Sequence, residues 1–217
     1  GWGGMAFEIA KQSQCEVIGI SLSENQINYC KKKAKELNMD NQVQFELSDY
    51  RKVKGKFHRI VSVGAFEHFG KKFYKTFFKT VKNLMTDDGV CLLHTIGSVD
   101  EPGPAQSWIQ KRIFPGGIIP SLSDMVVPIE ETGLVISDCE TLIHHYDKTL
   151  KAWLNNFMQN KEKAKHMHGK EFVRMWEFYL ASCSAAFKFR DLVVYQLQLV
   201  KKFTAPPSNN RNYIYNN

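Results

Sequence analysis

The chain has 217 residues, of which 43% are hydrophobic and 24% are charged. This length suits one domain of ordinary size, and the composition is typical of a soluble globular protein. No apolar run approaches the roughly 20 residues that cross a bilayer, which excludes a transmembrane helix from the printed sequence.

Lys and Arg (29) outnumber Asp and Glu (22), so the formal net charge is +7. The basic residues are scattered, which fits either solvated helix faces or attraction to an anionic surface. The sequence contains no zinc-finger spacing, aromatic ribonucleoprotein motif or basic zipper, so a lipid surface is favoured over nucleic acid. The five cysteines include no CxxC pair, which indicates free thiols in a reducing compartment and no metal site.

Strands and helices are expected to alternate along the chain. Strands are predicted at residues 15–20, 43–47, 57–63, 134–142 and 192–200, and residues 86–96 are predicted to form a turn followed by a buried strand. Helices are predicted at residues 21–37, 73–85, 150–159 and 171–187, with 124–133 as a short helix or a turn. Loops rich in Gly, Pro and Ser are predicted at residues 97–107 and 113–121.

This alternation predicts an α/β fold with a mainly parallel sheet and helices on both faces. The two late strands, 134–142 and 192–200, are expected to form an antiparallel pair at one edge. One domain is predicted over residues 1–203, and the tail from Thr204 (residues 204–217) is expected to be disordered. Ligands in such folds bind beyond the carboxyl ends of the strands.

Two polar clusters near the start of the chain are candidate ligand contacts. In "GWGG", residues 1–4, the backbone amides precede a helix and favour a negative group, although glycine turns also serve simple chain reversal. After the strand at 15–20, Ser21 and Gln26 could contact a nucleoside sugar or an amino-acid end. Ser23 and Gln26 have capping-box spacing, and for Ser23 helix capping is the preferred interpretation.

The next strand ends hold further candidates. Asp49 could accept a hydrogen bond from an exocyclic amine with Tyr50 against the base, or the two could be a turn residue beside a surface aromatic. Glu67 follows an apolar strand and is either a helix-capping or a catalytic carboxylate. His94 ends the next strand, where a lone histidine is usually a core residue. Because Glu67 and His94 end successive strands, both could point into the same crevice.

Seven segments in series now resemble a known family. They are "GWGG", "GISLSENQ", "VSVGAFEHFG", "LLHTIG", "IFPGGIIPS", "HHYDKTLKAWLNNF" and "MWEFYLASCSAAF". Together they resemble the cyclopropane-fatty-acyl-phospholipid synthases and the mycolic acid cyclopropane synthases over residues 1–202. The loop at 95–117 looks more like the phospholipid branch.

The resemblance implies the Rossmann-like sheet of class I methyltransferases, with S-adenosylmethionine (SAM) as the cofactor. In the family the glycine turn follows a strand that ends in an acidic residue and Gly-Cys, so the chain is expected to lack that first strand and a preceding helical region. The residues that would contact SAM are Gly1, Trp2, Gly3, Ser21, Leu22, Gln26, Asp49 and Tyr50.

The resemblance also implies an active-site bicarbonate ion. Its ligands would be the side chains of Glu67, His94 and Tyr146 and the backbone carbonyl of Ile96. Without the resemblance, Tyr146 is better explained as an amphipathic core residue. Bicarbonate would be the base that removes a proton from the transferred methyl group, so that a cyclopropane ring closes.

The substrate implied by the resemblance is an unsaturated acyl chain of a membrane phospholipid. The enzyme would act in the cytoplasm at the inner face of the membrane, and a homodimer is left open. The segment "SWIQKRIFPGGIIPS" (107–121) is either a membrane-binding loop or a packed active-site lid. Candidates to stabilise a carbocation on the chain are the aromatic rings of Phe66, Phe69, Tyr146 and Trp153.

Two other functions remain open from the sequence. A related methyltransferase could stop after methyl transfer and make a branched lipid, or methylate a small amine or sterol. A non-catalytic lipid-binding or scaffold protein would fit the incomplete glycine motif.

Overall fold

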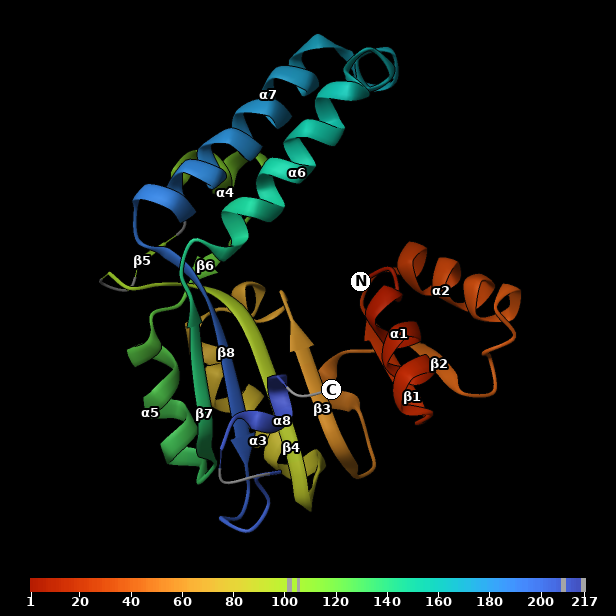
Figure 1. Cartoon of the computed structure of the whole chain (residues 1–217), viewed down its shortest axis with the longest axis vertical. Coiled ribbons are helices and arrows are strands. Elements are labelled where there is room, and N and C mark those ends of the chain that lie inside the picture. Colours follow the sequence, from red (N-terminus) through yellow and green to blue (C-terminus); the bar gives the residue numbers. More distant parts are fainter. Residues whose placement is uncertain (101–102, 105, 208–209, 216–217) are drawn as a thin grey trace. The chain divides into compact units, whose positions relative to one another are not determined.

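The computed structural model describes residues 1–100, 103–104, 106–207 and 210–215. The chain divides into two compact units, Gly1–Gly55 (unit 1) and Lys56–Asn217 (unit 2). Figure 1 shows the elements of both units with their labels.

Unit 1 is a two-stranded parallel sheet with helices. Its elements are α1 (Gly4–Ser13), β1 (Val17–Ser21), α2 (Glu24–Glu36), β2 (Val43–Leu47) and the short 3-10 helix η1 (Tyr50–Lys52). β1 and β2 pair in parallel from Val17 opposite Val43 to Ser21 opposite Leu47. A parallel pair needs a crossover connection, and α2 provides it. The two strands and the helix between them were predicted from the sequence, and the prediction is confirmed.

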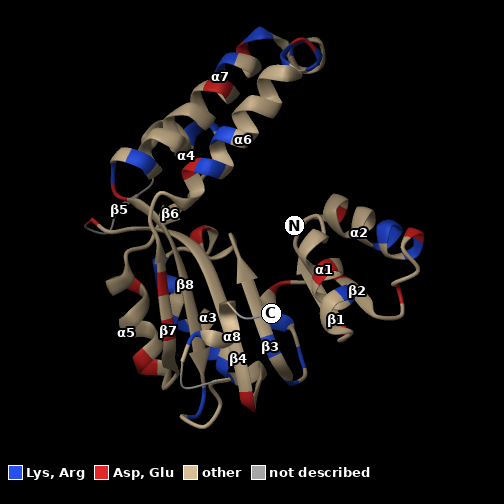
Figure 2. Ribbon diagram, viewed as in Figure 1, with Lys and Arg blue, Asp and Glu red and all other residues tan. Residues whose placement is uncertain are grey.

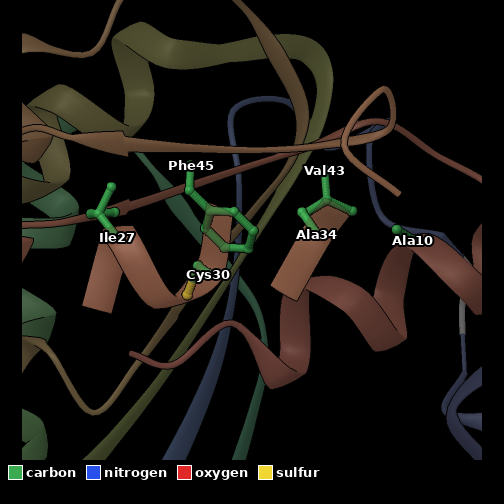
Figure 3. Packing of buried hydrophobic residues seen from close by; sticks show 6 residues of the cluster. All are labelled: Ala10, Ile27, Cys30, Ala34, Val43 and Phe45. Atoms are coloured by element: carbon green, nitrogen blue, oxygen red, sulfur yellow. The ribbon is translucent and has the colours of Figure 1, made fainter. Parts of the chain in front are cut away.

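The apolar stripe of α2 forms the core of unit 1. Ile27, Cys30 and Ala34 are buried and pack with Val43 and Phe45 of β2, and Ala10 of α1 completes the cluster (Figure 3). Leu37 continues the same helical spacing but is 44% exposed. It is the C-cap residue of α2, so the helix ends before its side chain reaches the core.

Unit 2 is built on a four-stranded sheet. The strands are β3 (Phe57–Val63), β4 (Met85–Ser98), β7 (Val135–Leu142) and β8 (Leu192–Val200), in the order β3-β4-β8-β7. β3 and β4 are parallel, whereas β8 is antiparallel to both β4 and β7. The predicted antiparallel pair, β7 and β8, is confirmed. Because β8 lies between β4 and β7, the sheet is mixed.

Shorter elements follow the strands of unit 2. They are η2 (Phe66–His68), η3 (Lys71–Phe73), α3 (Tyr74–Leu84), α4 (Ser107–Arg112), α5 (Leu122–Thr132) and the strand pair β5 (Gly103–Pro104) and β6 (Ile118–Ile119). β6 lies in the segment 113–121, which the sequence predicts as a loop. The segment predicted as a short helix or a turn is the helix α5, which begins with a capping box of Ser121 and Asp124 and ends at Gly133.

Two long helices extend from the sheet. α6 (His145–Gln159) and α7 (Lys161–Phe189) contact each other along their length, and Figure 1 shows the pair pointing away from the strands. Both were predicted from the sequence, and both are longer than predicted. At their base Leu150, Leu180 and Phe187 pack with Val194 of β8 in one buried cluster. At the far end Gly169, with a positive φ of 87°, interrupts α7.

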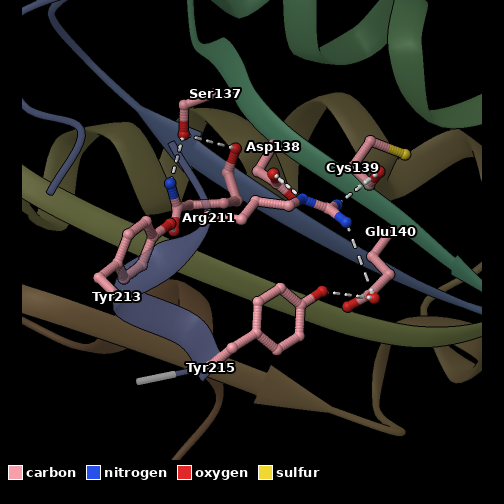
Figure 4. Close-up of polar contacts among 8 residues, drawn as sticks. Ser137, Asp138, Cys139, Glu140, Arg211, Tyr213 and Tyr215 are labelled. Atoms are coloured by element: carbon pink, nitrogen blue, oxygen red, sulfur yellow. Dashed lines mark hydrogen bonds and ion pairs between the residues drawn. The ribbon is translucent and has the colours of Figure 1, made fainter. Parts of the chain in front are cut away.

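The C-terminal segment differs from the disorder predicted from Thr204. Residues 212–215 form α8 (Asn212–Tyr215), and Arg211 donates to both carboxylate oxygens of Asp138 on β7 at 2.7 and 2.6 Å (Figure 4). The Tyr213 hydroxyl donates to Gln198 of β8 at 2.7 Å. These partners lie 15 to 73 positions away in the sequence, so local composition could not indicate them. The predicted disorder at residues 208–209 and 216–217 concerns positions outside the described residues.

In the described part of the chain, no helix combines the length and the apolarity needed to cross a bilayer. The described structure contains no disulfide: Cys30 and Cys91 are buried free thiols, and Cys183 is half-buried.

Gly97 of β4 gives a test of the fold. A Cβ atom there would lie 2.9 Å from the carbonyl oxygen of Pro120 and would overlap the ring of Tyr195 on β8. That ring is fixed because its hydroxyl donates to the carbonyl of Ser98 at 3.0 Å. Gly97→Ala is therefore expected to lower the free energy of unfolding by about 1–3 kcal/mol, as overpacking does.

Urea denaturation measures this change. Gly4→Ala is the control, because a Cβ atom at Gly4 meets nothing within 4 Å. Equal denaturation midpoints for the two variants would contradict the packing described around Gly97.

Candidate active site

A cavity of about 470 Å³ lies in unit 2, beyond the carboxyl ends of β3 and β4. Side chains of α6 and α7 and the segment 106–119 line it, together with residues that follow the strands. Most of these side chains are apolar or aromatic. They include Ile96, Ile109, Phe114, Tyr146, Leu150, Trp153, Tyr179, Cys183 and Phe187. The size and lining are typical of a ligand pocket.

The Glu67 carboxylate lies at this cavity and is 7% exposed. Gly64, with a positive φ of 63°, turns the chain after β3, and its N–H donates to the carbonyl of His94 at 3.1 Å. Glu67 follows on η2. Its Oε1 accepts a 2.6 Å hydrogen bond from the backbone N–H of Ile96. Its Oε2 is buried and has no hydrogen-bond donor among the described residues. A buried acceptor of this kind costs free energy unless a ligand or a proton satisfies it.

His94 lies on β4 beside this carboxylate. Its Nδ1 is 3.1 Å from Nε2 of Gln196, the residue opposite it on β8. Because an amide NH2 group only donates, Nδ1 is the acceptor and the neutral ring carries its hydrogen on Nε2. Burial lowers the pKa of His94 from its ordinary 6.5, while the negative charge of Glu67 acts in the opposite direction and His145 lowers the pKa further. His94 is not among the side chains that line the cavity.

Tyr146 reaches the cavity from the first turn of α6. His144, with a positive φ of 56°, directs the chain from β7 into this helix. The Tyr146 ring packs against Phe187 at 5.0 Å and against Trp153 at 5.9 Å between centroids. Burial raises the pKa of Tyr146, and the charge of Glu67 raises it further, so the phenol stays protonated.

Asp147, next to Tyr146, fixes α6 to α7. Its carboxylate accepts hydrogen bonds from Ser184 of α7 and from Lys151 one turn along α6. Both bonds lower the pKa of Asp147, and the bond from Lys151 has the larger effect. The neighbouring phenol is thereby held in place by a buried polar contact as well as by ring packing.

The structure thus brings Glu67 and Tyr146 to one cavity and His94 within electrostatic range of Glu67. The predicted contact of Ile96 differs in detail. Its N–H is bonded to Glu67, and its carbonyl accepts a hydrogen bond from the Thr95 hydroxyl at 3.0 Å. The roles of these residues in catalysis stay predictions.

Two of the four aromatic candidates, Tyr146 and Trp153, line the cavity. Phe66 does not: it is fully buried and stacks on Tyr74 at 4.1 Å. Phe69 is not a lining residue either, so neither of these two rings faces this cavity. The reason is that η2 turns Glu67 toward the cavity and the ring of Phe66 into the core.

Several lining residues were not predicted from the sequence, among them Phe114, Tyr179 and Cys183. Tyr179 and Cys183 are one turn apart on α7, and the apolar stripe of that helix could have indicated both. Burial raises the pKa of the Cys183 thiol to about 11, so this thiol is protonated. Phe114 lies in an irregular segment and carried no such signal.

The residues predicted to contact SAM lie in unit 1. The Ser21 hydroxyl donates to the Gln26 side chain at 2.7 Å, and Ser23 caps α2 as preferred from the sequence. Gly3 has a positive φ of 83°, and a Cβ atom there would lie 2.9 Å from Sγ of Cys30, so the fold itself requires this glycine. Leu22 is 74% exposed.

The remaining residues of this predicted set have local partners. Asp49 caps η1 and forms an ion pair with Arg51 at 2.6 Å, which lowers its pKa to about 2. Tyr50 follows Asp49 and begins η1. The ring of Trp2 packs edge-on against the ring of Tyr29, with 5.4 Å between centroids. The carbonyl oxygen of Gly1 accepts a hydrogen bond from the Cys30 thiol at 3.7 Å. A role for any of them in cofactor binding stays a prediction.

Comparison with known proteins identifies the family. The family model described as mycolic acid cyclopropane synthetase matches residues 1–197. The chain belongs to this family. The cyclopropane-fatty-acyl-phospholipid synthase of Escherichia coli K12 is 36% identical over 197 residues, which are 91% of this chain and 50% of that protein. The tuberculostearic acid methyltransferase UfaA1 of Mycobacterium tuberculosis is 32% identical over 95% of this chain and 49% of its own length.

Solved structures of the cyclopropane synthase family have the same fold. The cyclopropane synthase MmaA2 from Mycobacterium tuberculosis matches with a TM-score of 0.86 and 28% identity, over 92% of this chain and 74% of that chain. The mycolic acid cyclopropane synthase CmaA1, solved with SAH and CTAB, matches with a TM-score of 0.84 and 30% identity, again over 92% of this chain and 74% of that chain. The predicted resemblance and the predicted methyltransferase fold are confirmed. The chain spans about half the length of the first curated relatives it matches.

The titration of His94 tests the electrostatics of this site. Its pKa is lowered by burial, so we expect half-protonation below pH 6.5, measured by NMR of the imidazole carbons. Since the unfolded chain takes up the proton first, the contribution of His94 to stability is complete above about pH 6.5 and is lost as the pH falls. Glu67→Gln removes the charge that favours the imidazolium and should lower the midpoint further. A midpoint at or above 6.5 in the unmodified protein would show that His94 is not buried as described.

Proposed function

We propose that this chain carries the active site of an enzyme that uses SAM to add a methylene group across the double bond of an unsaturated phospholipid acyl chain, forming a cyclopropane ring. One observation carries the proposal: in a chain of this family, a buried carboxylate oxygen of Glu67 without a donor lies at an apolar cavity shared with Tyr146. We place the reaction at the cytoplasmic surface of a membrane, because the substrate is a membrane lipid.

SAM, when bound, supplies a methyl group on a positively charged sulfonium. In our proposal the residues that hold it are Gly1, Trp2, Gly3, Ser21, Leu22, Gln26, Asp49 and Tyr50 of unit 1. The conformation of Gly3 and the bond between Ser21 and Gln26 preorganise part of this set. For Asp49 to bind an amine, its ion pair with Arg51 must open or be shared.

The polar groups at the cavity fit a bicarbonate ion, which would supply the base. The Oε2 atom of Glu67 needs a donor, and the O–H of bicarbonate is one. The Tyr146 phenol is protonated and can donate to an anion. His94 lies beside Glu67 but does not line the cavity; it is neutral with a hydrogen on Nε2, so in our proposal it donates without adding charge. A carboxylate can therefore lie beside this anion because they share a proton.

The apolar lining supports an acyl-chain substrate. Ile96, Ile109 and Leu150 offer no hydrogen bonds, so they bind hydrocarbon and exclude water from a reactive cation. The rings of Tyr146 and Trp153 can stabilise positive charge by about 0.5–2 kcal/mol each. Glu67 then holds the only carboxylate oxygen that is buried without a donor among the described residues, close to where a proton must leave.

A second candidate is methyl transfer without ring closure. It is favoured by two relatives, UfaA1 and the probable fatty acid methyltransferase of Pseudomonas putida, which is 31% identical over 94% of this chain and 53% of its own length. The two reactions separate by mass spectrometry of the product lipids. Ring closure adds CH2 and removes the double bond without a methyl branch, whereas methylation leaves a branch.

Substitution of the acid–base residues tests the proposal in the protein as it is encoded. Glu67→Gln cannot accept the shared proton, and His94→Ala removes a donor. Each is expected to lower ring formation at least about 100-fold while SAM binding is retained. Mass spectrometry of lipids after incubation with SAM measures the product.

Glu130→Gln and His58→Ala are the matched controls, since both residues are exposed and neither lines the cavity. Unchanged product in Glu67→Gln or His94→Ala would refute the assigned roles.

Calorimetry with SAM separates an enzyme from a non-catalytic lipid-binding protein. We expect a saturable heat of binding, reduced in Gly3→Val because a side chain there meets Cys30 and Phe45 and requires a strained φ. A flat titration of the folded, unmodified protein would favour the non-catalytic alternative.

A further inference from the structure

The free end of the α6–α7 pair forms a surface that the proposed reaction does not use. We call residues 157–176 the hairpin tip. It contains an open groove of about 310 Å³. The groove is lined by Phe157, Asn160, Lys163, Ala164, Met167, His168, Phe172 and Trp176.

The hairpin tip is strongly basic. It holds four lysines and one arginine against two glutamates, and Figure 2 shows basic residues along this part of α7. Lys161 and Lys165 form ion pairs with Glu177 and Glu162. The other three cations have no ion pair within the described residues. They are Lys163, Lys170 and Arg174, and all three are exposed.

Large apolar side chains lie among these cations. Met167 is 62% exposed and Met158 is 39% exposed. Phe172 stacks on Trp176 at 5.7 Å with nearly parallel rings, and His168 contacts Phe172 at 4.7 Å. The break at Gly169 lets residues 161–168 take a direction of their own. Exposed thioether and aromatic groups between lysines are typical of a surface that binds an anionic lipid interface.

The hairpin tip is also continuous with the candidate active site. Trp176 lines the groove, Tyr179 lines the 470 Å³ cavity, and their rings are in contact at 5.1 Å. One row of aromatic side chains on α7 therefore connects the groove at the hairpin tip with the cavity of the candidate active site. A lipid surface at the tip would lie next to the place where an acyl chain is needed.

The other candidate for membrane contact, the segment 107–121, is packed. Trp108 contacts Phe178 edge-on at 4.7 Å, and Ile109 and Ile113 pack against the buried cluster at the base of α6 and α7. Trp108, Ile109 and Ile113 of this segment are therefore engaged within unit 2, although Phe114 is 40% exposed.

We propose that the hairpin tip docks on the surface of an anionic phospholipid bilayer, with Lys163, Lys170 and Arg174 at the head groups and Met167 at the apolar boundary. The role of this docking in substrate delivery rests on the proposed function; the docking itself does not. We assign a lipid surface as the occupant because the exposed Met167 lies among exposed cations, and the aromatic row beside it leads to the apolar cavity.

Vesicle co-sedimentation tests the docking with the whole protein. The vesicles contain phosphatidylglycerol and phosphatidylcholine in one arm and phosphatidylcholine alone in the other. We expect binding to the anionic vesicles that weakens with salt. Lys163→Glu/Lys170→Glu should reduce that binding more than tenfold, and Met167→Asn should reduce it less.

Lys54→Glu/Lys79→Glu is the matched control, because it makes the same charge change at two exposed lysines outside the hairpin tip. It should bind within about twofold of the unmodified protein. Equal binding by the tip variant and the control would overturn the proposal. So would conversion of a dimer to a monomer by the tip variant, seen by light scattering, with vesicle binding unchanged.

Activity is measured separately on the same lipid in neutral detergent micelles. The tip variant should keep its micellar activity and lose activity on vesicles. If neither the unmodified protein nor any variant makes product from lipid in vesicles or in micelles, the proposed function fails. The co-sedimentation experiment still decides whether the hairpin tip docks on the bilayer.

Discussion

The arrangement of the candidate site depends on the hydrogen bond from the Ile96 N–H to one oxygen of Glu67. This bond holds a carboxylate in a nearly dry place and turns its second oxygen to a position without a donor. A buried charge in this state is costly for the fold, and such costs are typical of functional sites. The neutral His94 and the protonated Tyr146 are in electrostatic range of the same carboxylate, so the region offers proton donors beside it.

The α6–α7 pair links this site to the rest of unit 2. Its base closes the cavity with Tyr146 and Tyr179, and the buried bond between Ser184 and Asp147 keeps the two helices in register there. Its free end carries the basic groove. One supersecondary element therefore provides both the wall of the candidate site and the surface we assign to lipid. Because α6 follows β7 and α7 precedes β8, the antiparallel strand pair at the edge of the sheet fixes where the helices stand.

Periodicity found the main elements because burial on one face imposes a spacing that a sequence displays directly. The helix α2, the two antiparallel late strands and both long helices were predicted on this basis. The same reasoning did not find the mixed order of the larger sheet, since the place of β8 between β4 and β7 depends on pairings 52 to 110 positions apart. It also gave disorder where Arg211 meets Asp138, because an ion pair across 73 positions leaves no local pattern.

By itself, the sequence determined the family, the α/β class and the residues that follow each strand, because these depend on motif order and on local spacing. Only the tertiary structure decided which of those residues meet. It gave Glu67 its partner on β4, placed Tyr146 and Trp153 at the cavity, and turned Phe66 into the core. The physical reason is that burial and hydrogen bonding are properties of neighbours in space, and the neighbours of each of these side chains come from strands and helices far apart in the chain.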